Sequence, residues 1–355
     1  MNITFIFGNG FDIQLGLASR YSDFLDAYIA MPSESETILE FKKYLKDSKN
    51  RQLWSDAENA MGEYLGYFDD ENIDWYHERI EDFETHMIEY LEAQQNRCTY
   101  ALKSDIEEAF INFITKSSKD VLNNRSMELY PAVINSNSNS IYRFITFNYT
   151  NLLDNIVKCC SKEGLNQREH FLCKNEFGPV IHIHGTLDSQ IIMGVNDETQ
   201  LDLSGGVTLT DPLRWELIKP KMDGEFLNNQ DIRIMTEIQQ SDIIYIYGVS
   251  YGKTDMLWWN ELEKWLKANP AHKLVAFIRE PTRKINNRLP WAELVYENTK
   301  RADILRKLGI QRYDPEFDKL INQIYIILNT SRLNMKGLIL PFEFADLPTE
   351  MVTTS

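Results

Sequence analysis

The sequence predicts a three-layer α/β fold, with a mostly parallel, Rossmann-like sheet and a large helical insertion after the first strand. Two observations carry this prediction. Short runs rich in β-branched and aromatic residues alternate with helical patterns along the second half of the chain. Between the first such run and the others lies a long stretch with apolar residues at three- and four-residue steps, which is typical of packed helices.

The elements follow in order along the chain. The first strand is expected at residues 3–7, and helices with charged, solvent-facing sides are expected within residues 22–135. The NSNSNS stretch at 135–140 indicates a loop. Later strands are expected at 141–147, 180–183, 243–247 and 273–278. The stretches MLWWNELEKWLKAN and FDKLINQIYIILNTS read as helices.

These elements divide the chain into three parts. An α/β nucleotide-binding core is expected from residues 1–21 and 136–340, a helical insertion from 22–135, and a C-terminal tail from 341–355. With 355 residues, 43% hydrophobic and 25% charged, the chain can bury a substantial core, and its composition argues against disorder. We expect the insertion to contribute to the ligand pocket, because it leaves the sheet directly after the first strand end.

Charge and cysteine content exclude several classes of protein. The formal net charge of −16 opposes broad nucleic-acid binding, which depends on neutralising phosphates. The four cysteines form no CxxC pair, so neither a zinc ribbon nor a disulfide framework is indicated. No basic leader or run of bilayer length stands out, so we expect a cytoplasmic protein without a membrane partner.

Polar residues and glycines follow four of the predicted strands. The first strand runs into GNGFD, and the others run into NYTN, HG and GVS. In an open parallel sheet, ligands bind in the crevice beyond the carboxyl ends of the strands. We therefore expect Asn9, Asn148 and His184 to line a single cleft, with Gly248 and Ser250 in its wall.

The turn after the first strand carries two glycines and a carboxylate. Gly8 and Gly10 allow a tight turn and a close approach of a ligand to the backbone. A helix beginning near Phe11 would direct free N–H groups at an anion such as pyrophosphate. The motif is not GxGxxG, because Ile13 occupies the third glycine position. Asp12 suits a ribose hydroxyl; the alternative is a tight strand-to-helix turn with an Asp cap.

Two histidines share one face of the third predicted strand. His182 reads as a buried structural histidine, since a third metal ligand beside the pair is not evident. His184 lies at the strand end and suits a general base near neutral pH. Asn148 offers a donor and an acceptor for water or a sugar hydroxyl, and a plain loop asparagine is the alternative.

The stretch GVSYG fits the G-x-S-x-G nucleophile elbow. An α/β-hydrolase would need an acid and a histidine further along the chain. The only later histidine, His272, follows within 22 residues and leaves no room for the usual strands. We therefore expect Ser250 to line a binding loop rather than to act as a nucleophile.

Together these motifs resemble the AbiH family of bacterial abortive-infection proteins. The resemblance rests on FIFGNGFDIQLGLASRYSDF, WSDAE, TFNYTNLLD, IHIHGTLD and IYGVSYGKTD, which occur in this order from residue 1 to about residue 260. It implies a role in defence against phage in which the infected cell is sacrificed. It leaves open a phage protein as trigger, a companion defence protein and an oligomer.

The same strand ends are more distantly similar to sirtuin-like proteins that bind and cleave NAD. That resemblance implies binding roles for Gly8 and Gly10, and roles in catalysis for Asn148 and His184. The chain has Asp12 where those proteins prefer Ser or Thr, and Thr150 where an Asp usually follows the Asn. It also lacks zinc-ribbon cysteines, so lysine deacylation is not expected.

The leading hypothesis is an NAD glycohydrolase that depletes NAD by breaking the bond between ribose and nicotinamide. Asn148 and His184 would be catalytic and no metal would be needed. The residues expected to bind the dinucleotide are Gly8, Asn9, Gly10, Phe11, Asp12, Gly248, Ser250 and Asp255. The alternative is a non-catalytic nucleotide-sensing or partner-binding module. A nuclease is the third option, and it would need a metal–carboxylate cluster that the sequence does not assemble.

Overall fold

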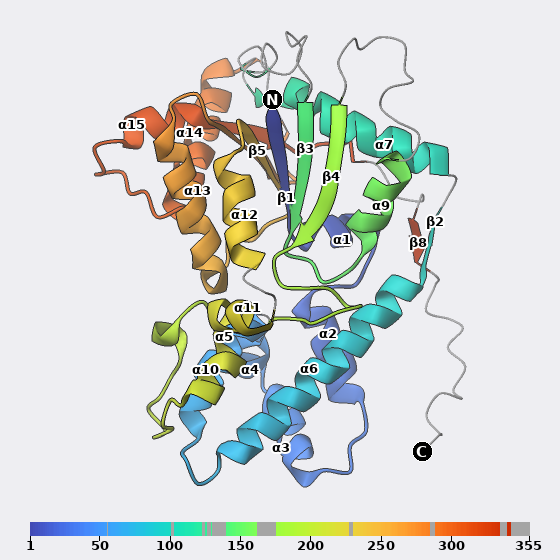
Figure 1. Cartoon of the computed structure of the whole chain (residues 1–355), viewed down its shortest axis with the longest axis vertical. Coiled ribbons are helices and arrows are strands. Elements are labelled where there is room, and N and C mark those ends of the chain that lie inside the picture. Colours follow the sequence, from blue (N-terminus) through green and yellow to red (C-terminus); the bar gives the residue numbers. More distant parts are fainter. Residues whose placement is uncertain are drawn as a thin grey trace.

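The computed structural model describes most of the chain and confirms the α/β fold (Figure 1). The described residues are 1–54, 56–100, 103–122, 125, 129, 140–161, 175–226, 230–284, 288–333 and 339–341. The predicted loop at 135–139 and most of the predicted tail lie outside them. In Figure 1 the sheet and its helices fill the upper part of the molecule, and a second group of helices lies below.

The main sheet has six parallel strands in the order β4-β3-β1-β5-β6-β7. Numbered along the chain, this order is 3-2-1-4-5-6, the arrangement of dinucleotide-binding Rossmann folds. The strands are β1 (Asn2–Phe7), β3 (Ser140–Thr146), β4 (Asn175–His182), β5 (Ile243–Tyr247), β6 (Lys273–Ile278) and β7 (Ile324–Leu328). The register aligns Phe7 with Thr146 and Tyr247, and Thr146 with His182, so four strands end level with one another.

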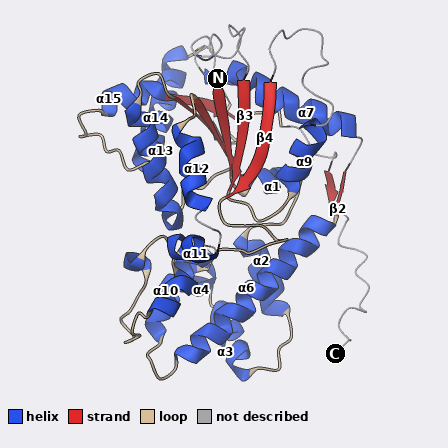
Figure 2. Ribbon diagram, viewed as in Figure 1, coloured by secondary structure: helices blue, strands red, loops and turns tan. Residues whose placement is uncertain are grey.

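Helices bury both faces of this sheet, as a parallel sheet requires (Figure 2). On one face Phe5 and Phe7 pack with residues of α7 (Lys103–Lys116) and α9 (Leu152–Ser161). On the other face Ile6 packs with residues of α12 (Gln230–Gln239), α13 (Met256–Ala268) and α14 (Pro290–Lys307). The short α1 (Gly10–Leu15) follows β1 directly.

The prediction of a single helix through FDKLINQIYIILNTS is wrong. Helix α15 (Phe317–Leu320) and a 3₁₀ turn (Ile321–Gln323) give way to β7, the last strand of the sheet. All five residues of β7 are buried, and four of them are β-branched or aromatic. A continuous apolar run of this length fits a strand buried on both faces as well as a helix, and pairing with β6 decides the outcome.

The lower helices form a second core, which we call the helical lobe. It contains α2 (Tyr21–Ala30), α3 (Glu36–Leu45), α4 (Ser48–Leu53), α5 (Ala57–Tyr64), α6 (Ile73–Asn96), α10 (Asp211–Leu217) and α11 (Lys219–Phe226). Buried side chains such as Trp54 and Phe83 pack in one cluster with Leu213 and Ile218. The lobe therefore joins the first part of the chain to the segment that follows β4.

A two-stranded antiparallel sheet pairs β2 (Cys98–Tyr100) with β8 (Ile339–Pro341). None of the helices in the described ranges combines the length and the apolar composition that crossing a bilayer requires.

Candidate functional site

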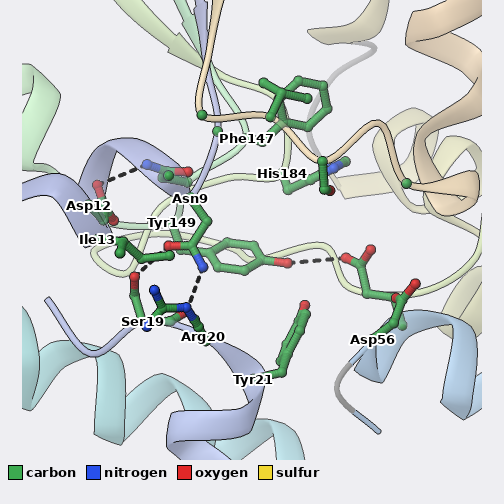
Figure 3. Close-up of a pocket in the computed structure, with 18 of the residues that line it drawn as sticks. Asn9, Asp12, Ile13, Ser19, Arg20, Tyr21, Asp56, Phe147, Tyr149 and His184 are labelled. Carbon is green, nitrogen blue, oxygen red and sulfur yellow. Dashed lines mark hydrogen bonds between the residues drawn. The ribbon is translucent and has the colours of Figure 1, made fainter. Parts of the chain in front are cut away.

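A cavity of about 660 Å³ lies between the carboxyl ends of the strands and the helical lobe (Figure 3). Its walls include Asn9, Asn148, His184, Gly248 and Ser250, so the prediction that these residues share one cleft is confirmed. The helical lobe also contributes, as expected, and supplies Ser22, Phe24, Asp56, Glu58, Met87 and Leu91. The cavity opens where the strand order reverses between β1 and β5, which is the ligand-binding position in sheets of this order.

The two glycines after β1 are required by the loop that follows β5. The Gly10 N–H donates to the carbonyl oxygen of Gly248 at 2.9 Å. A Cβ atom on Gly10 would lie 2.5 Å from Gly248 Cα, and one on Gly8 would lie 2.8 Å from the Gly248 oxygen. Gly248 itself has φ of +69°, which favours glycine. The glycines therefore allow the loop after β1 and the loop after β5 to pack directly against each other at the floor of the pocket.

This packing corrects, for two N–H groups, the expectation that the N–H groups at the start of α1 are free. The Gly10 N–H is bonded to Gly248, and the Phe11 N–H donates to the Gly8 oxygen at 2.9 Å. The Phe11 ring is fully buried against Phe7 and Tyr247 and does not line the pocket. The geometry therefore gives no support to a ligand contact through Phe11.

Asn9 fixes the segment that leads into the helical lobe. Its amide donates to the Ser19 carbonyl oxygen at 2.7 Å, and its side-chain oxygen accepts from the Ser19 hydroxyl. The next residue, Arg20, also lines the pocket. Asn9 therefore holds an arginine close to the glycine turn.

Asp12 orients Asn148 from beneath the pocket. The Asn148 amide donates to Asp12 Oδ1 at 2.8 Å, and the Thr150 hydroxyl donates to Asp12 Oδ2 at 2.6 Å. Burial raises the pKa of Asp12 to about 6, against the lowering effect of these two hydrogen bonds and of His182. Asp12 is therefore mostly ionised at pH 7 and accepts from the Asn148 NH₂ group.

The side-chain oxygen of Asn148 lacks a partner in the part of the chain that the structure describes. This Oδ1 atom is buried and accepts no hydrogen bond from any described residue. Because Asp12 takes the NH₂ group, the side-chain oxygen of this pocket-lining residue is left without a donor from the described residues. A buried acceptor without a partner costs folding free energy, so this oxygen suggests that a ligand or water donates a hydrogen bond to it.

His182 supports the same asparagine. Its Nδ1 lies 2.8 Å from the backbone carbonyl oxygen of Asn148, and its Nε2 lies 2.7 Å from Asp154 Oδ2. These contacts agree with its predicted role as a buried structural histidine. The described residues contain no group of three or more His, Cys, Asp or Glu side chains placed to hold a metal.

His184 and Asp255 form a hydrogen-bonded pair in the pocket wall. His184 Nε2 lies 2.9 Å from Asp255 Oδ1, and the Phe147 ring packs against the imidazole. The carboxylate can only accept, so we assign the proton of the neutral imidazole to Nε2 and the lone pair to Nδ1. No described residue hydrogen-bonds Nδ1. The pair therefore presents a base, in the way that an aspartate orients a catalytic histidine.

Lys219 joins this pair to the helical lobe. Its ammonium donates to Asp255 Oδ1 and to Glu58 Oε2, each at 2.8 Å, and Glu58 also accepts from the Thr254 hydroxyl at 2.9 Å. Burial opposes the charge of Asp255, but the Lys219 ammonium and the imidazole of His184 hold the pKa of Asp255 well below its usual range. Burial lowers the pKa of Lys219, and the two carboxylates more than reverse this effect.

Sequence reasoning missed two members of this network. Glu58 lies within WSDAE, which carried part of the family resemblance, but its carboxylate was assigned no role. Lys219 lies in no recognised motif. Asp255, predicted as a cofactor-binding residue, lines the pocket and contacts His184 and Lys219. His184 makes no hydrogen bond to Ser250 among the described residues, and Ser250 lies exposed in the pocket wall.

Positive and negative side chains lie on opposite sides of the pocket. In Figure 3, Asn9, Ser19 and Arg20 lie toward one side, His184 and Asp56 lie toward the other, and the Tyr149 ring extends between them. Arg20 is the one Lys or Arg side chain among the described residues that line the cavity. Asp56 lies on the opposite side, where Asp255 contacts His184 and Lys219 joins Asp255 to Glu58.

Comparison with known proteins agrees with the motifs. The family model described as "Bacteriophage abortive infection AbiH" matches residues 4–277 of the 355. No curated protein matches the chain. The chain belongs to the AbiH family, and its role lies in bacteriophage abortive infection.

Proposed function

We propose that this AbiH family member binds NAD in the pocket and hydrolyses the bond between its ribose and nicotinamide. The observation that carries the proposal is that Asn148, whose Oδ1 has no partner among the described residues, lines the same pocket as the His184–Asp255 pair. A carbonyl oxygen that needs a donor and an imidazole with a free lone pair are suited to hold and deprotonate a water molecule.

The reaction needs one water molecule and no further reactant. The water oxygen forms a bond to C1′ of the ribose while the bond from C1′ to the nicotinamide nitrogen breaks, and nicotinamide leaves with the bonding electron pair. Nδ1 of His184 takes a proton from the water. Asn148 Oδ1 accepts from the same water or from a ribose hydroxyl. The products are ADP-ribose, nicotinamide and one proton.

The charges of the pocket favour one orientation of the dinucleotide. The pyrophosphate is anionic and the nicotinamide ring is cationic, so the pyrophosphate belongs near Arg20. The ring and the developing positive charge on the ribose belong near Asp56, Glu58 and Asp255, where three carboxylates face the single ammonium of Lys219. A volume of about 660 Å³ lies within the usual range for ligand sites.

The two residues that depart from the sirtuin-like pattern, Asp12 and Thr150, contact each other. Position 12 carries a carboxylate where a hydroxyl is preferred, and position 150 carries a hydroxyl where a carboxylate is usual. In this chain the Thr150 hydroxyl donates to Asp12. The exchange keeps one hydroxyl and one carboxylate beneath Asn148, which supports a retained function for that asparagine. Because both oxygens of Asp12 have partners inside the protein, we assign the ribose contact to Asn148.

Calorimetry with the intact chain tests whether the pocket binds NAD. The wild-type protein and the Asn148→Ala variant are titrated with NAD, and Asn151→Ala serves as the control because Asn151 does not line the pocket. We expect about tenfold weaker binding for Asn148→Ala, since one hydrogen bond to a polar ligand group is lost. Equal affinity in all three proteins would contradict the proposed site. Binding by the wild type without any product would favour the nucleotide-sensing alternative.

A further inference from the structure

The His184–Asp255 pair shares a carboxylate oxygen with a lysine. Asp255 Oδ1 lies 2.9 Å from His184 Nε2 and accepts from the Lys219 ammonium at 2.8 Å. The same ammonium lies 3.5 Å from His184 Nε2. Both of these nitrogens carry protons and neither can accept, so this approach is electrostatic and places a positive charge beside the imidazole. The imidazole of His184 therefore meets two charges of opposite sign.

The backbone holds Lys219 in this position. The Lys219 N–H donates to the Val195 oxygen at 2.9 Å, and the Val195 N–H donates to the Leu217 oxygen at 2.8 Å. Lys219 is 5% exposed, so solvent screens its charge little. Burial lowers the pKa of Lys219, but Asp255 and Glu58 raise it above the usual value. The side chain therefore stays an ammonium near neutral pH.

Without this ammonium, Asp255 would favour the wrong form of His184. A buried carboxylate beside an imidazole stabilises the imidazolium, which has no lone pair with which to take a proton. Lys219 opposes the imidazolium in two ways. It donates to the same Oδ1 atom, which reduces the negative charge presented to His184, and it repels an imidazolium directly.

The other charges around His184 do not supply this effect. The remaining charged groups that line the two cavities beside His184, the main pocket and a space of about 10 Å³ that also includes Lys219, are one arginine and five carboxylates: Arg20, Asp12, Asp56, Glu58, Asp223 and Asp231. The carboxylates, when ionised, favour the imidazolium. Arg20 lies toward the other side of the main pocket (Figure 3). Lys219 is therefore the cation that acts on His184.

We propose that Lys219 is a positioning residue for the hydrolysis of NAD, which keeps His184 neutral through its ammonium, and that Glu58 limits this effect. The inference rests on the proposed function, in which Nδ1 of His184 takes a proton from water. Lys219 begins α11 and Glu58 belongs to α5, whereas His184 follows β4. The helical lobe thus determines the pH range in which a base beside the sheet is active.

The test follows the protonation of His184 in two variants with opposite expected effects. Lys219→Met removes the ammonium, and Glu58→Gln removes a carboxylate that accepts from this ammonium at 2.8 Å. We expect the pH at which His184 is half protonated to rise by about one unit in Lys219→Met and to fall by about one unit in Glu58→Gln. NMR of carbon-13-labelled histidine measures this in the intact, ligand-free protein. The chain has six histidines, and His184→Ala identifies the signal.

The rate of NAD hydrolysis should follow the same shifts. The acid limb of the pH profile of kcat/KM reports the essential base of the free enzyme. It should move to higher pH in Lys219→Met and to lower pH in Glu58→Gln. Loss of a merely structural contact would impair both variants alike, but it would not move the two profiles in opposite directions.

The control is Lys42→Met, because Lys42 is also buried, donates to the Met31 backbone oxygen at 3.0 Å and does not line the main pocket. Its pH profile should match the wild type. Thermal unfolding of each variant shows whether it is folded. Glu58→Gln keeps the contact between Lys219 and Asp255, so it carries the test if Lys219→Met does not fold.

The outcomes separate this inference from the proposed function. Unchanged midpoints, or shifts in the same direction in both variants, would overturn the role of Lys219, and an active wild type would then leave the proposed function standing. Opposite shifts by NMR in a protein that releases no nicotinamide would remove the proposed function and leave the control of His184 by Lys219.

Discussion

At the scale of single residues, the central feature is the orientation of Asn148. The amide of an asparagine has no preferred face of its own, and here Asp12 determines which end meets the pocket. Asp12 contacts no ligand in this account and acts only through Asn148. Its effect therefore depends on its charge, since only the ionised carboxylate accepts from both Asn148 and Thr150.

This dependence predicts that NAD binding weakens in acid. Burial raises the pKa of Asp12 to about 6, so the carboxylate is mostly ionised at pH 7 and mostly protonated at pH 5. A protonated Asp12 accepts well at only one of its two oxygens, so either the Asn148 amide or the Thr150 hydroxyl loses its acceptor and the hold on Asn148 weakens. We expect the affinity for NAD, measured by calorimetry, to fall about tenfold from pH 7 to pH 5.

Asp12→Asn isolates the effect of this one group from other carboxylates that titrate in the same range. The variant should bind NAD weakly at both pH values and should lose most of the pH dependence. A variant as dependent on pH as the wild type would show that a carboxylate other than Asp12 controls binding. Besides its hydrogen-bond partners Thr150 and Asn148, His182 also lowers the pKa of Asp12.

The sequence identified site residues only where a local pattern marked them. Asn148 and His184 each follow a strand, and strand ends of a parallel sheet meet at one edge, so their convergence could be predicted. Glu58 and Lys219 lie on helices, where a charged side chain in the sequence usually means a solvent-facing one. Each is buried because the other is its partner, and that pairing spans 161 residues.

At the scale of elements, the pocket depends on the contact between the loops after β1 and β5. The loops touch through backbone atoms at Gly10 and Gly248, so no side chain can relax to make room. The glycine turn after β1 therefore has mainly a packing role between the two loops, and it also forms part of the pocket wall. The sequence raised the tight turn as an alternative, but it could not show that the partner was another strand end.

Gly10→Ala should accordingly destabilise the protein and widen the floor of the pocket. The added Cβ would lie 2.5 Å from Gly248 Cα, so one loop must move. We expect the free energy of unfolding, measured by denaturant titration, to fall by about 1–3 kcal/mol. We expect the affinity for NAD to fall as well.

Gly252→Ala is the matched control, since Gly252 also lines the pocket. A Cβ atom added to Gly252 would lie 3.6 Å from its nearest neighbour, Thr254 Oγ1, and the φ of −59° at this position suits alanine. The free energy of unfolding should change by less than about 0.5 kcal/mol. Equal loss in both variants would mean that the loop contact at Gly10 has no special importance.

At the scale of the whole molecule, the site is built from residues of both the main sheet and the helical lobe. The sheet supplies Asn148, His184 and Asp255, and the helical lobe supplies Glu58 and Lys219. The fold class could be predicted because alternating strands and helices have few arrangements. The composition of the lobe could not, because α10 joins it from beyond β4 through core contacts, and α11 joins it through the Lys219–Glu58 pair, and neither leaves a local pattern.

The measurement that tests the account most directly is the release of nicotinamide from NAD by the purified intact chain. Proton NMR follows the products for the wild type, His184→Ala and His77→Ala, with and without extract from phage-infected cells. His77 lies on the helical lobe, pairs with Glu216 and does not line the pocket. The account predicts nicotinamide and ADP-ribose in equal amounts from the wild type and His77→Ala, and a loss of about 100-fold or more for His184→Ala. No release by the wild type under either condition, or equal release by His184→Ala, would contradict it.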